Sequence, residues 1–417
     1  MRRADINLDG IFRAEAGRLV AWLARLLGPG RLALIEDAVQ YAFAAALARW
    51  PDDGVPDKPA AWLGVAARNK ALDRLKREAR SAPFDEAMFD EAGAWRLAFA
   101  DPEAGGGMDD TLALMFVACH PALDHETQTM LTLKTVCGFN VAEVARAYLS
   151  TAEAVTQRLV RAKRRIRELG LAFRIPEGDE LRARLPALID AVYLLFNGGY
   201  TAREGAEVIA PALCAEALRL AELLAGHPRT QCGACHALAA LICLHHARAR
   251  ARSGPAGDLI LLADQDRTLW DRDLIARGQA HLAAAMTSDV LTPLHVEAGI
   301  AGVHAAAKDF AATDWSLVAR GYATLEDLKP TPVVRLNAAI ARAYAEGPEA
   351  GLAHLMALTD ERRLHGYALY HAACGDLLHR LNRTAEAACA FGRALDCPAN
   401  TAEQAHLRRR MEACRAA

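Results

Sequence analysis

Residues 139–170 contain two amphipathic patterns that are separated by a short polar break. In the first pattern the apolar residues recur at helical intervals: Val141, Val144, Ala145 and Tyr148. In the second they follow alternating steps of four and three residues: Val155, Leu159, Ala162, Ile166 and Leu169. Both spacings place the apolar side chains on one face of an α-helix. The pattern therefore predicts a short helix, a turn, and a longer second helix.

The polar break between these patterns has the form of a helix start. Ser150 and Glu153 have the spacing of a capping box, in which the hydroxyl and the carboxylate each satisfy a backbone N–H group. We therefore expect the second helix to begin at Ser150. Cations fill most of the polar surface of this helix: Arg158, Arg161, Lys163, Arg164, Arg165 and Arg167.

A helix-turn-helix with this charge distribution is typical of proteins that bind duplex DNA. The N-terminal residues of a recognition helix approach base edges, whereas its cations lie near phosphates. The residues expected nearest the bases are Glu153, Ala154, Thr156, Gln157 and Arg158. Those expected nearer the DNA backbone are Arg161, Lys163, Arg164 and Arg165. The alternative is an ordinary solvated surface helix, which is what most runs of charge form.

A second pair of helical patterns lies upstream, between Ile35 and Arg80. The first has an apolar stripe of Ile35, Val39, Phe43, Leu47 and Trp50, and leaves Asp37, Gln40, Tyr41 and Ala44 on the other side. The second opens near Pro59, a residue suited to a first helical turn. Its apolar and polar positions include Trp62, Val65, Ala66, Asn69, Leu72, Asp73 and Leu75. Cations again load this helix: Arg68, Lys70, Arg74, Lys76, Arg77 and Arg80.

The motifs DAVQxAF and AWLxxxARNxALDRLKR, within residues 35–80, resemble region 2 of extracytoplasmic-function (ECF) sigma factors of the sigma-70 family. The helix-turn-helix that ends in QRLVRAKRRIRE resembles region 4 of the same family. The two motifs occur in the family's order, and the resemblance covers roughly residues 8–175. Residues 81–108 between them are acidic and glycine-rich, as expected of a flexible linker.

The resemblance implies a role for each set of residues. Asp37, Gln40 and Tyr41 would face the clamp helices of the beta-prime subunit of RNA polymerase. The partner implied is the core enzyme, with its beta-prime and beta subunits. The family usually has an acidic residue in place of Tyr41. The residues implied at the minus-10 promoter element are Trp62, Arg68, Asn69, Asp73, Arg74 and Arg77. Cations and an aromatic ring suit captured single-stranded bases, although Trp62 could equally be a core residue. Glu153, Thr156, Gln157, Arg158 and the cations that follow would read the minus-35 element.

Beyond Ile175 the sequence is uniformly helical in pattern, with breaks at Gly198-Gly199, Ser253-Gly254-Pro255, Pro330 to Pro332 and Gly347-Pro348. Gly375, Ala387, Phe391 and Ala394 stand at the offsets of a tetratricopeptide repeat, and Arg380 to Thr384 would form its turn. Residues 337–358 resemble part of a degenerate preceding repeat. The expected fold is therefore all-α: region 2 at 1–80, the linker at 81–108, region 4 at 109–175, and a C-terminal helical domain at 176–417.

The extension resembles that of a group of sigma factors with a C-terminal tetratricopeptide-like domain. That group usually has Asn-Glu-Gly-Tyr where this chain has Asn197-Gly198-Gly199-Tyr200. The resemblance implies a sigma factor that is regulated by its fused domain, which would bind an unknown protein or peptide. The alternative is a free-standing helix-turn-helix regulator with a protein-binding repeat domain.

Composition narrows the function further. The formal net charge is only −2, so the DNA-facing charge is local to two helices and the affinity for DNA alone should be modest. The start, MRRADINLDGIFR, has cations but no apolar run behind them, and no stretch of about 20 apolar residues occurs. We therefore expect a cytoplasmic chain without a membrane contact.

Two polar clusters could carry other chemistry. Cys232, Cys235 and His236 spell CGACH, with His245 and His246 downstream. Their Ala- and Leu-rich surroundings favour a packed helix over a metal or redox site, and we expect no cofactor or metal. Asp264, Asp266, Asp271 and Asp273 alternate with Arg267 and Arg272. They could form a carboxylate site, but helix caps and a charge-tied turn are favoured, and we expect no enzyme activity.

Overall fold

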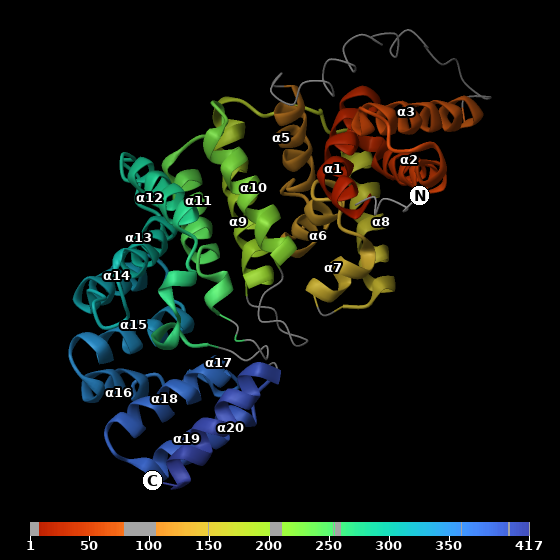
Figure 1. Ribbon diagram of the computed structural model, residues 1–417. Helices are drawn as coiled ribbons and strands as arrows, with labels where there is room; N and C mark the ends of the chain where they lie inside the picture. Colours follow the sequence, from red (N-terminus) through yellow and green to blue (C-terminus); the bar gives the residue numbers. More distant parts are fainter. Residues whose placement is uncertain are drawn as a thin grey trace. The chain divides into compact units, whose positions relative to one another are not determined.

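The computed structural model describes residues 8–78, 106–148, 150–200, 211–252, 254, 260–359, 361–398 and 401–416. Within these ranges the regular elements are helices, and no strand occurs (Figure 1). The prediction of an all-α fold is therefore confirmed. The chain divides into two compact units, residues 1–195 and 196–417, which we call unit 1 and unit 2.

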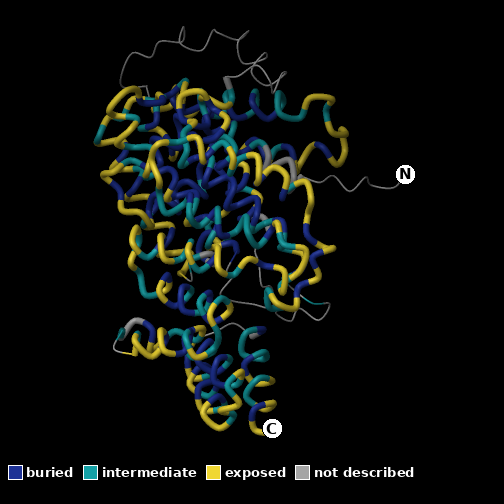
Figure 2. Tube along the Cα trace, turned by 90° about the vertical axis from the view of Figure 1, so that its left-hand side faces the viewer, coloured by how far each residue is buried: buried dark blue, intermediate teal, exposed yellow. Residues whose placement is uncertain are grey.

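Unit 1 contains the elements α1 to α8 and the first part of α9. Their bounds are α1 Leu8–Leu27, η1 Pro29–Arg31, α2 Leu32–Asp53, α3 Pro59–Glu78, α5 Gly106–Ala118, α6 His125–Thr135, α7 Val141–Ala147, α8 Ala152–Leu169 and α9 Gly178–Tyr200. Helix α1 packs on α2 and α5, α2 packs on α3, and α8 packs on both α6 and α7. Buried residues recur at the spacing of one apolar face, as Val155, Leu159, Ala162 and Ile166 do in α8. Figure 2 colours the buried residues dark blue and the exposed ones yellow along the chain.

A close backbone contact joins α1 to the end of α6. A Cβ atom on Gly17 would lie 1.8 Å from the backbone carbonyl oxygen of Val136, which directly follows α6. No side chain can occupy that position while the two backbones stay in place, so the packing of α1 on α6 depends on glycine. Gly17 and Val136 are both buried.

The upstream helices match the predicted pair, with one difference in the buried stripe. Ile35, Val39, Phe43 and Trp50 of α2 are buried, but Leu47 is 59% exposed. Successive steps of four residues advance by 400° on a helix with 100° per residue, so the stripe drifts by about 40° at each step. By Leu47 that drift has carried the side chain out of the packed face, and Ala46 takes its place in the core.

The predicted linker at 81–108 falls largely outside the described residues, since the structure describes none of 79–105. Its last three residues, Gly106 to Met108, are helical because α5 begins at Gly106.

Unit 2 is a run of helices in which each helix from α10 to α16 packs on the next along the chain, α16 packs on α18, and α18, α19 and α20 pack in succession (Figure 1). After α9 the bounds are α10 Pro211–Gly226, α11 Gly233–His246, η4 Ala249–Ala251, η5 Leu262–Asp264, η6 Arg267–Leu269, α12 Arg272–Ala285, α13 Pro293–Ala306, α14 Trp315–Leu328, α15 Pro332–Ala345, α16 Pro348–Met356, α17 Arg362–His365, α18 Ala368–Arg380, α19 Thr384–Leu395 and α20 Thr401–Ala416. The predicted breaks before Pro332 and Pro348 coincide with the starts of α15 and α16.

The residues of the predicted repeat lie together between α18 and α19. Ala387, Phe391 and Ala394 are buried in one apolar cluster, and Gly375 of α18 is also buried. A Cβ atom on Gly375 would lie 2.9–3.0 Å from the Phe391 ring, so the small residue makes room for the large one. The turn between the two helices contains Asn382, whose φ of 58° is in the left-handed region. Whether these helix pairs are tetratricopeptide repeats stays a prediction.

The predicted break at Gly198-Gly199 is wrong, because both residues are helical and lie within the last turn of α9. Gly199 is buried against α10, where an added Cβ atom would lie 2.7 Å from the Leu213 side chain. Gly199 permits close packing of α9 on α10, while an added Cβ atom on the exposed Gly198 would meet nothing within 4 Å. The boundary between the two units falls inside α9, between residues 195 and 196. The domain ranges expected from the sequence, with a division between 175 and 176, stay a prediction.

The acidic segment at 264–273 has a structural role that agrees with the favoured prediction. The carboxylates of Asp266 and Asp271 accept hydrogen bonds from the backbone N–H groups of Thr268 and Leu274, and so cap η6 and α12. Arg267 is buried with its guanidinium 4.7 Å from the Trp270 ring centroid. It donates hydrogen bonds to the backbone carbonyls of residues 304 and 307, at 2.5 and 2.7 Å.

Candidate nucleic-acid interface

The helix-turn-helix is built by two sets of caps. Asn140 and Glu143 form a capping box at the start of α7: Glu143 N donates to Asn140 Oδ1 at 2.9 Å, and Asn140 N donates to Glu143 Oε2 at 2.8 Å. At the start of α8 the cap is Thr151, whose side chain accepts from Ala154 N. The predicted cap at Ser150 is therefore wrong by one residue, and the capping box lies one helix earlier. Both misplacements arise because several hydroxyl, amide and carboxyl side chains compete for the same N–H groups.

The apolar face of α8 is the predicted one. Val155, Leu159, Ala162 and Ile166 are all buried, while Leu169 is half-buried at the last turn. Gly170 ends the helix with a φ of 58°, a conformation that favours glycine. The residues left exposed on the opposite face include Glu153, Ala154, Thr156, Gln157, Arg161, Arg164 and Arg165. Helix α8 thus presents amide, hydroxyl and guanidinium groups to solvent on one face.

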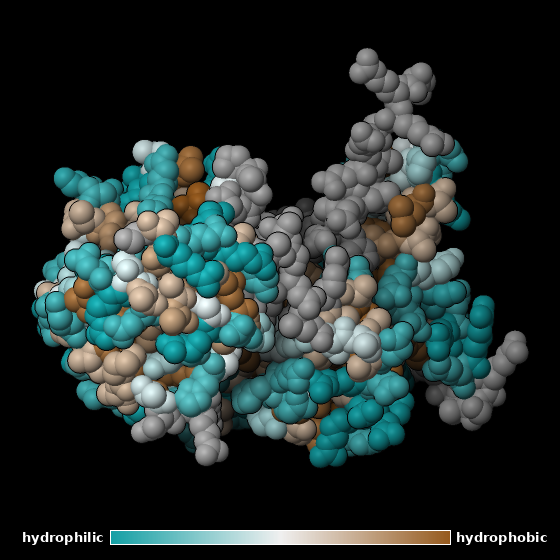
Figure 3. Space-filling model, turned by 90° about the horizontal axis from the view of Figure 1, so that it is seen from below, coloured by the Kyte–Doolittle hydropathy of each residue, from teal (hydrophilic) through white to brown (hydrophobic). Residues whose placement is uncertain are grey.

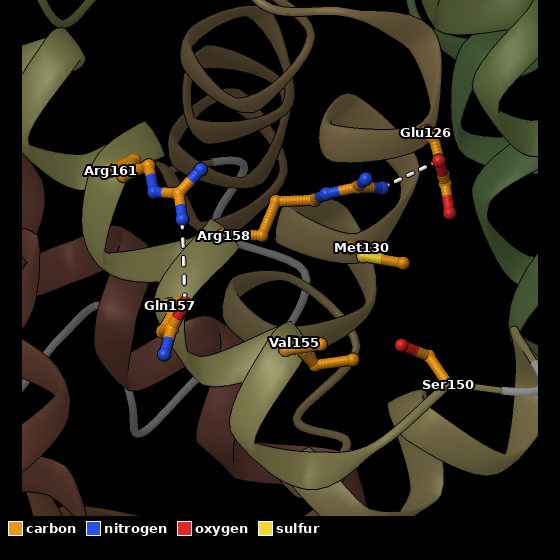
Figure 4. Close-up of a pocket in the computed structure, with 8 residues that line it drawn as sticks. Glu126, Met130, Ser150, Val155, Gln157, Arg158 and Arg161 are labelled. Atoms are coloured by element: carbon orange, nitrogen blue, oxygen red, sulfur yellow. Dashed lines mark hydrogen bonds and ion pairs between the residues drawn. The ribbon is translucent and has the colours of Figure 1, made fainter.

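Two of the predicted DNA contacts are held by partners from other helices. Arg158 forms an ion pair with Glu126 of α6, with an N–O distance of 2.5 Å. Figure 4 shows this side chain reaching toward Glu126 along a pocket that both residues line, whereas Arg161 turns to Gln157 of its own helix. The pocket is also lined by Met130, Ser150 and Val155.

Lys163 lies in a contact between α8 and α2. Its Nζ atom is 2.5 Å from Oε2 of Glu36, and the two side chains are only 16% and 8% exposed. Lys134 of α6 lies close enough to this ion pair to interact with both of its charges. Burial lowers the pKa of Lys134, the Glu36 carboxylate opposes this effect, and the Lys163 ammonium group adds to it. Glu36 was not selected from the sequence. The signal that could have found it is an acidic residue directly beside the apolar stripe of α2, a position that is buried and therefore needs a cationic partner.

Element η1 extends this contact to the end of α8. An added Cβ atom on Gly30 would lie 3.6 Å from the Cα atom of Arg167. Helices α1 and α2 therefore pack against α6 and α8 within unit 1, and the two cationic helices α3 and α8 belong to one compact body.

Helix α3 carries the predicted minus-10 residues on its accessible side. Asn69, Asp73, Arg74 and Arg77 are exposed, and Arg68 is half-buried. Arg74 binds Asp37 of α2 at 3.0 Å and Glu78 at 3.4 Å, both as exposed ion pairs. Such pairs stabilise little and exchange easily with other anions.

Trp62 packs on the core without being fully buried. It is half-buried, and its ring meets the fully buried Trp50 ring edge-on with centroids 5.5 Å apart. One part of the ring therefore packs in the core, and another part is accessible to solvent. Such a ring is fixed in orientation, which suits an aromatic platform for a base.

The three residues that the sequence assigned to core polymerase share the exposed face of α2. Asp37, Gln40 and Tyr41 are all exposed, and Tyr41 is 49% exposed. The ammonium group of Lys70 lies 4.2 Å from the centroid of the Tyr41 ring, which links this face to α3. An acid, an amide and a phenol in this arrangement offer acceptors and an apolar surface to a partner helix.

Neither a metal centre nor a membrane span is found where the structure is described. No group of three or more His, Cys, Asp or Glu side chains could hold a metal ion among the described residues. Within the same residues, no helix is long and apolar enough to cross a membrane. The surface seen in Figure 3 is mainly hydrophilic, with apolar residues scattered between the polar ones.

Comparison with known proteins assigns the N-terminal helices. A model of sigma-70 region 2 matches residues 11–81, which include most of α1 and all of α2 and α3. Residues 11–81 form a sigma-70 region 2. This match supports a sigma-70 family factor that acts in transcription initiation together with core RNA polymerase and promoter DNA.

The rest of the chain matches proteins whose function is not described. A model of a family of unknown function, DUF6596, matches residues 184–286. The chain is 39% identical to "Uncharacterized protein R00370" of Rhizobium meliloti (strain 1021) over 387 residues. The aligned part covers 91% of this chain and 90% of that protein. The chain belongs to the same family as that protein. No solved structure matches the chain.

Proposed function

We propose that this chain is a sigma factor of the extracytoplasmic-function type, which directs core RNA polymerase to specific promoters and is regulated by its own C-terminal helices. The observation that carries the proposal is the sigma-70 region 2 at residues 11–81. The helix-turn-helix of α7 and α8 supports it, because a second DNA-binding element follows region 2 along the chain. RNA synthesis itself belongs to the polymerase, so this chain needs no catalytic residue.

The roles of the region 2 surfaces follow from their chemistry. The exposed face of α2, with Asp37, Gln40 and Tyr41, binds the clamp helices of the beta-prime subunit. The cations of α3 hold the phosphates of the melted minus-10 strand, and the accessible part of Trp62 supports an unstacked base. The exposed ion pair between Arg74 and Asp37 costs little to break when a phosphate takes the place of the carboxylate.

The role of α8 is to hold the minus-35 duplex. Thr156 and Gln157 are exposed near its N-terminus, where a recognition helix meets base edges. Arg161, Arg164 and Arg165 lie farther along and hold phosphates. Arg158 and Lys163 join them only after leaving Glu126 and Glu36, their present partners.

Promoter binding requires unit 1 to open. The centres of the minus-10 and minus-35 elements are about 25 base pairs apart, or about 85 Å at a rise of 3.4 Å per base pair. A compact body of 195 residues has a radius of gyration of about 16 Å and a diameter of about 40 Å. Region 2 and α8 must therefore separate, which breaks the contact between Glu36 and Lys163.

The helices of unit 2 regulate the promoter-specific activity of the chain. Their consecutive packing and the α18–α19 pair suit a repeat domain that binds a protein or peptide. A chain that ends after Leu195 is the informative truncation. A shorter chain that ends near residue 176 would lose Arg184, which donates a hydrogen bond to the backbone carbonyl of Phe116 inside unit 1. If truncation raises promoter-specific transcription, unit 2 inhibits the sigma factor; if truncation lowers it, unit 2 activates.

A mobility-shift experiment tests the proposal against a free-standing DNA-binding regulator. A sigma factor is expected to bind promoter DNA tightly only when core RNA polymerase is present, since the cations expected to face DNA lie on α3 and α8 and the net charge of the chain is only −2. The same shift with the chain alone and with core polymerase would favour the free-standing regulator. Tight binding that core polymerase does not alter would contradict the proposal.

Charge removal on α8 is expected to weaken promoter binding without changing its specificity. Arg164 and Arg165 are 66% and 52% exposed, and their ion pairs among the described residues are with the exposed Glu168, so the double change to glutamine should leave folding intact. Loss of two phosphate contacts should lower affinity for all promoters alike and reduce the salt slope by about two. The measurement is holoenzyme binding to a promoter over a range of salt concentrations.

The matched variant is Gln157→Ala on the same exposed face. If Gln157 meets a base edge, its loss should cost about 1–3 kcal/mol on the best minus-35 sequence and relax the preference at one position. A double arginine variant that binds as well as the unmodified chain at every salt concentration would exclude α8 from the DNA contact.

A further inference from the structure

The motif CGACH lies at the start of α11 and brings two sulfur atoms together. Cys232 is the N-cap residue of α11, and Cys235 lies in its first turn. Their Sγ atoms are 3.5 Å apart. The Cys232 side chain makes no capping hydrogen bond, so its sulfur is left facing that of Cys235. Neither thiol belongs to the surfaces assigned to DNA or polymerase.

The two thiols differ in access and in charge. Cys235 is fully buried and donates a hydrogen bond to the backbone carbonyl of Thr230 at 3.2 Å, whereas Cys232 is half-exposed. The adjacent Cys235 thiol lowers the pKa of Cys232 to about 6, against the opposing effect of burial. The same contact and burial raise the pKa of Cys235. Cys232 is therefore the nucleophile of the pair, and Cys235 is a protonated thiol.

Other cysteines of unit 2 differ from Cys232 in both burial and pKa. Cys214 and Cys243 are buried, and burial raises the pKa of each thiol to about 12. Buried thiols of this kind are inert small apolar residues. Cys232 departs from them because the residue is only partly buried and its sulfur lies 3.5 Å from that of a second thiol, with which it can close a disulfide.

The backbone at the pair is packed against the segment that joins α12 and α13. An added Cβ atom on Gly233, between the two cysteines, would lie 2.3 Å from Cβ of Ser288 and 2.9 Å from Nε2 of His295. In this connecting segment Val290 and Leu291 are 66% and 51% exposed. A change in the geometry of the cysteine pair therefore acts on a segment that reaches the surface.

We propose that Cys232 and Cys235 are a redox-active dithiol that a hydroperoxide oxidises to an intramolecular disulfide. The Cys232 thiolate attacks the terminal oxygen of the hydroperoxide, the O–O bond breaks, and an alcohol, or water when the oxidant is hydrogen peroxide, leaves with a proton. The sulfenic acid so formed on Cys232 is attacked by the Cys235 sulfur, and water leaves with the Cys235 proton. In sum, two thiols and one hydroperoxide give one disulfide, one alcohol and one water.

This proposal does not depend on the sigma-factor function. It gives unit 2 a chemical input, and reduction by an external dithiol through thiol-disulfide exchange would return the pair to its starting state.

The experiment treats the full-length chain with hydrogen peroxide and maps its cysteine peptides by mass spectrometry. The expected result is loss of two hydrogens from the peptide that contains both cysteines, reversed by dithiothreitol. Cys235→Ser should instead hold a sulfenic acid on Cys232 that dimedone traps, and Cys232→Ser should give neither product. Cys389→Ser, which removes an exposed cysteine elsewhere in unit 2, is the matched control and should form the disulfide as the unmodified chain does.

Two outcomes would overturn the proposal. One is that peroxide oxidises Cys389 while Cys232 and Cys235 stay reduced in the unmodified chain. The other is that glutathione disulfide closes the pair but hydrogen peroxide does not, which would exclude a hydroperoxide as the oxidant. Both are measured on the unmodified protein, so they do not depend on whether a variant folds.

Discussion

Replacing Gly17 by valine is expected to destabilise unit 1 by about 3 kcal/mol or more, since the new side chain cannot be accommodated without moving the backbone. The added Cβ atom would lie 1.8 Å from the carbonyl oxygen of Val136, and no rotamer change relieves a contact between Cβ and backbone. Helix α1 must therefore move away from the end of α6. Calorimetric unfolding of the full-length chain measures the loss as a lower transition temperature for unit 1.

Gly107→Ala is the matched control for this variant. Gly107 lies in α5 of the same unit, and an added Cβ atom there would meet only the end of the Arg18 side chain, at 3.7 Å. This control should be neutral or slightly stabilising, because alanine is favoured over glycine in a helix. If Gly17→Val unfolds at the same temperature as Gly107→Ala, then α1 does not pack on α6 as described. Because this contact joins region 2 to the helices that follow it, its loss should also favour the open form of unit 1.

Acidification below about pH 6.5 is expected to destabilise unit 2 strongly. Its histidines with lowered pKa values are His245, His246, His281, His295, His304 and His406. Burial is the first cause in each case. For His304, which is lowered to about 4, the guanidinium groups of Arg248 and Arg267 add to the effect of burial. These groups stay neutral in the folded state at a pH where the unfolded chain takes up protons.

The sign follows from proton uptake. A histidine whose pKa is depressed on folding contributes its full stability above the unfolded value of about 6.5, and the contribution is lost as the pH falls toward the folded value. For His304 the loss between pH 6.5 and 4 amounts to about 3 kcal/mol. Calorimetry at about pH 7.5 and about pH 5 should show a lower transition temperature for unit 2 at the lower pH.

His304→Gln is the variant that separates this cause from general acid effects. The His304 ring meets the Trp315 ring edge-on at 5.3 Å, so the variant will lose some packing at every pH. Its transition temperature should nevertheless fall less between the two pH values than that of the unmodified chain. An equal fall in both proteins would exclude His304 as a source of the acid sensitivity.

The sequence predicted what depends on local spacing. The buried face of α8, the start of α3 at Pro59 and the caps of the acidic segment all follow from residues within a few turns of one another. Errors appeared where local signals compete or drift, as at Ser150 and Thr151, or at Leu47, which the helical drift carries to the surface.

Contacts between distant residues were out of reach for the same reason. Glu36 and Lys163 are 127 positions apart, and nothing in either local pattern says that they meet. The sulfur–sulfur distance at Cys232 and Cys235 and the place of Gly17 against Val136 likewise depend on how helices pack. The sequence named Lys163 and the cysteines but could not show which partner each one has.

The most direct test of the sigma-factor proposal is run-off transcription with purified core RNA polymerase. Templates should carry the region upstream of the chain's own coding sequence, together with other promoter fragments from the same genome. We expect specific transcripts that require the full-length chain and that weaken when Arg164 and Arg165 are both replaced by glutamine. If no template gives a transcript that depends on the chain, while the chain alone still shifts duplex DNA, the protein is not a sigma factor.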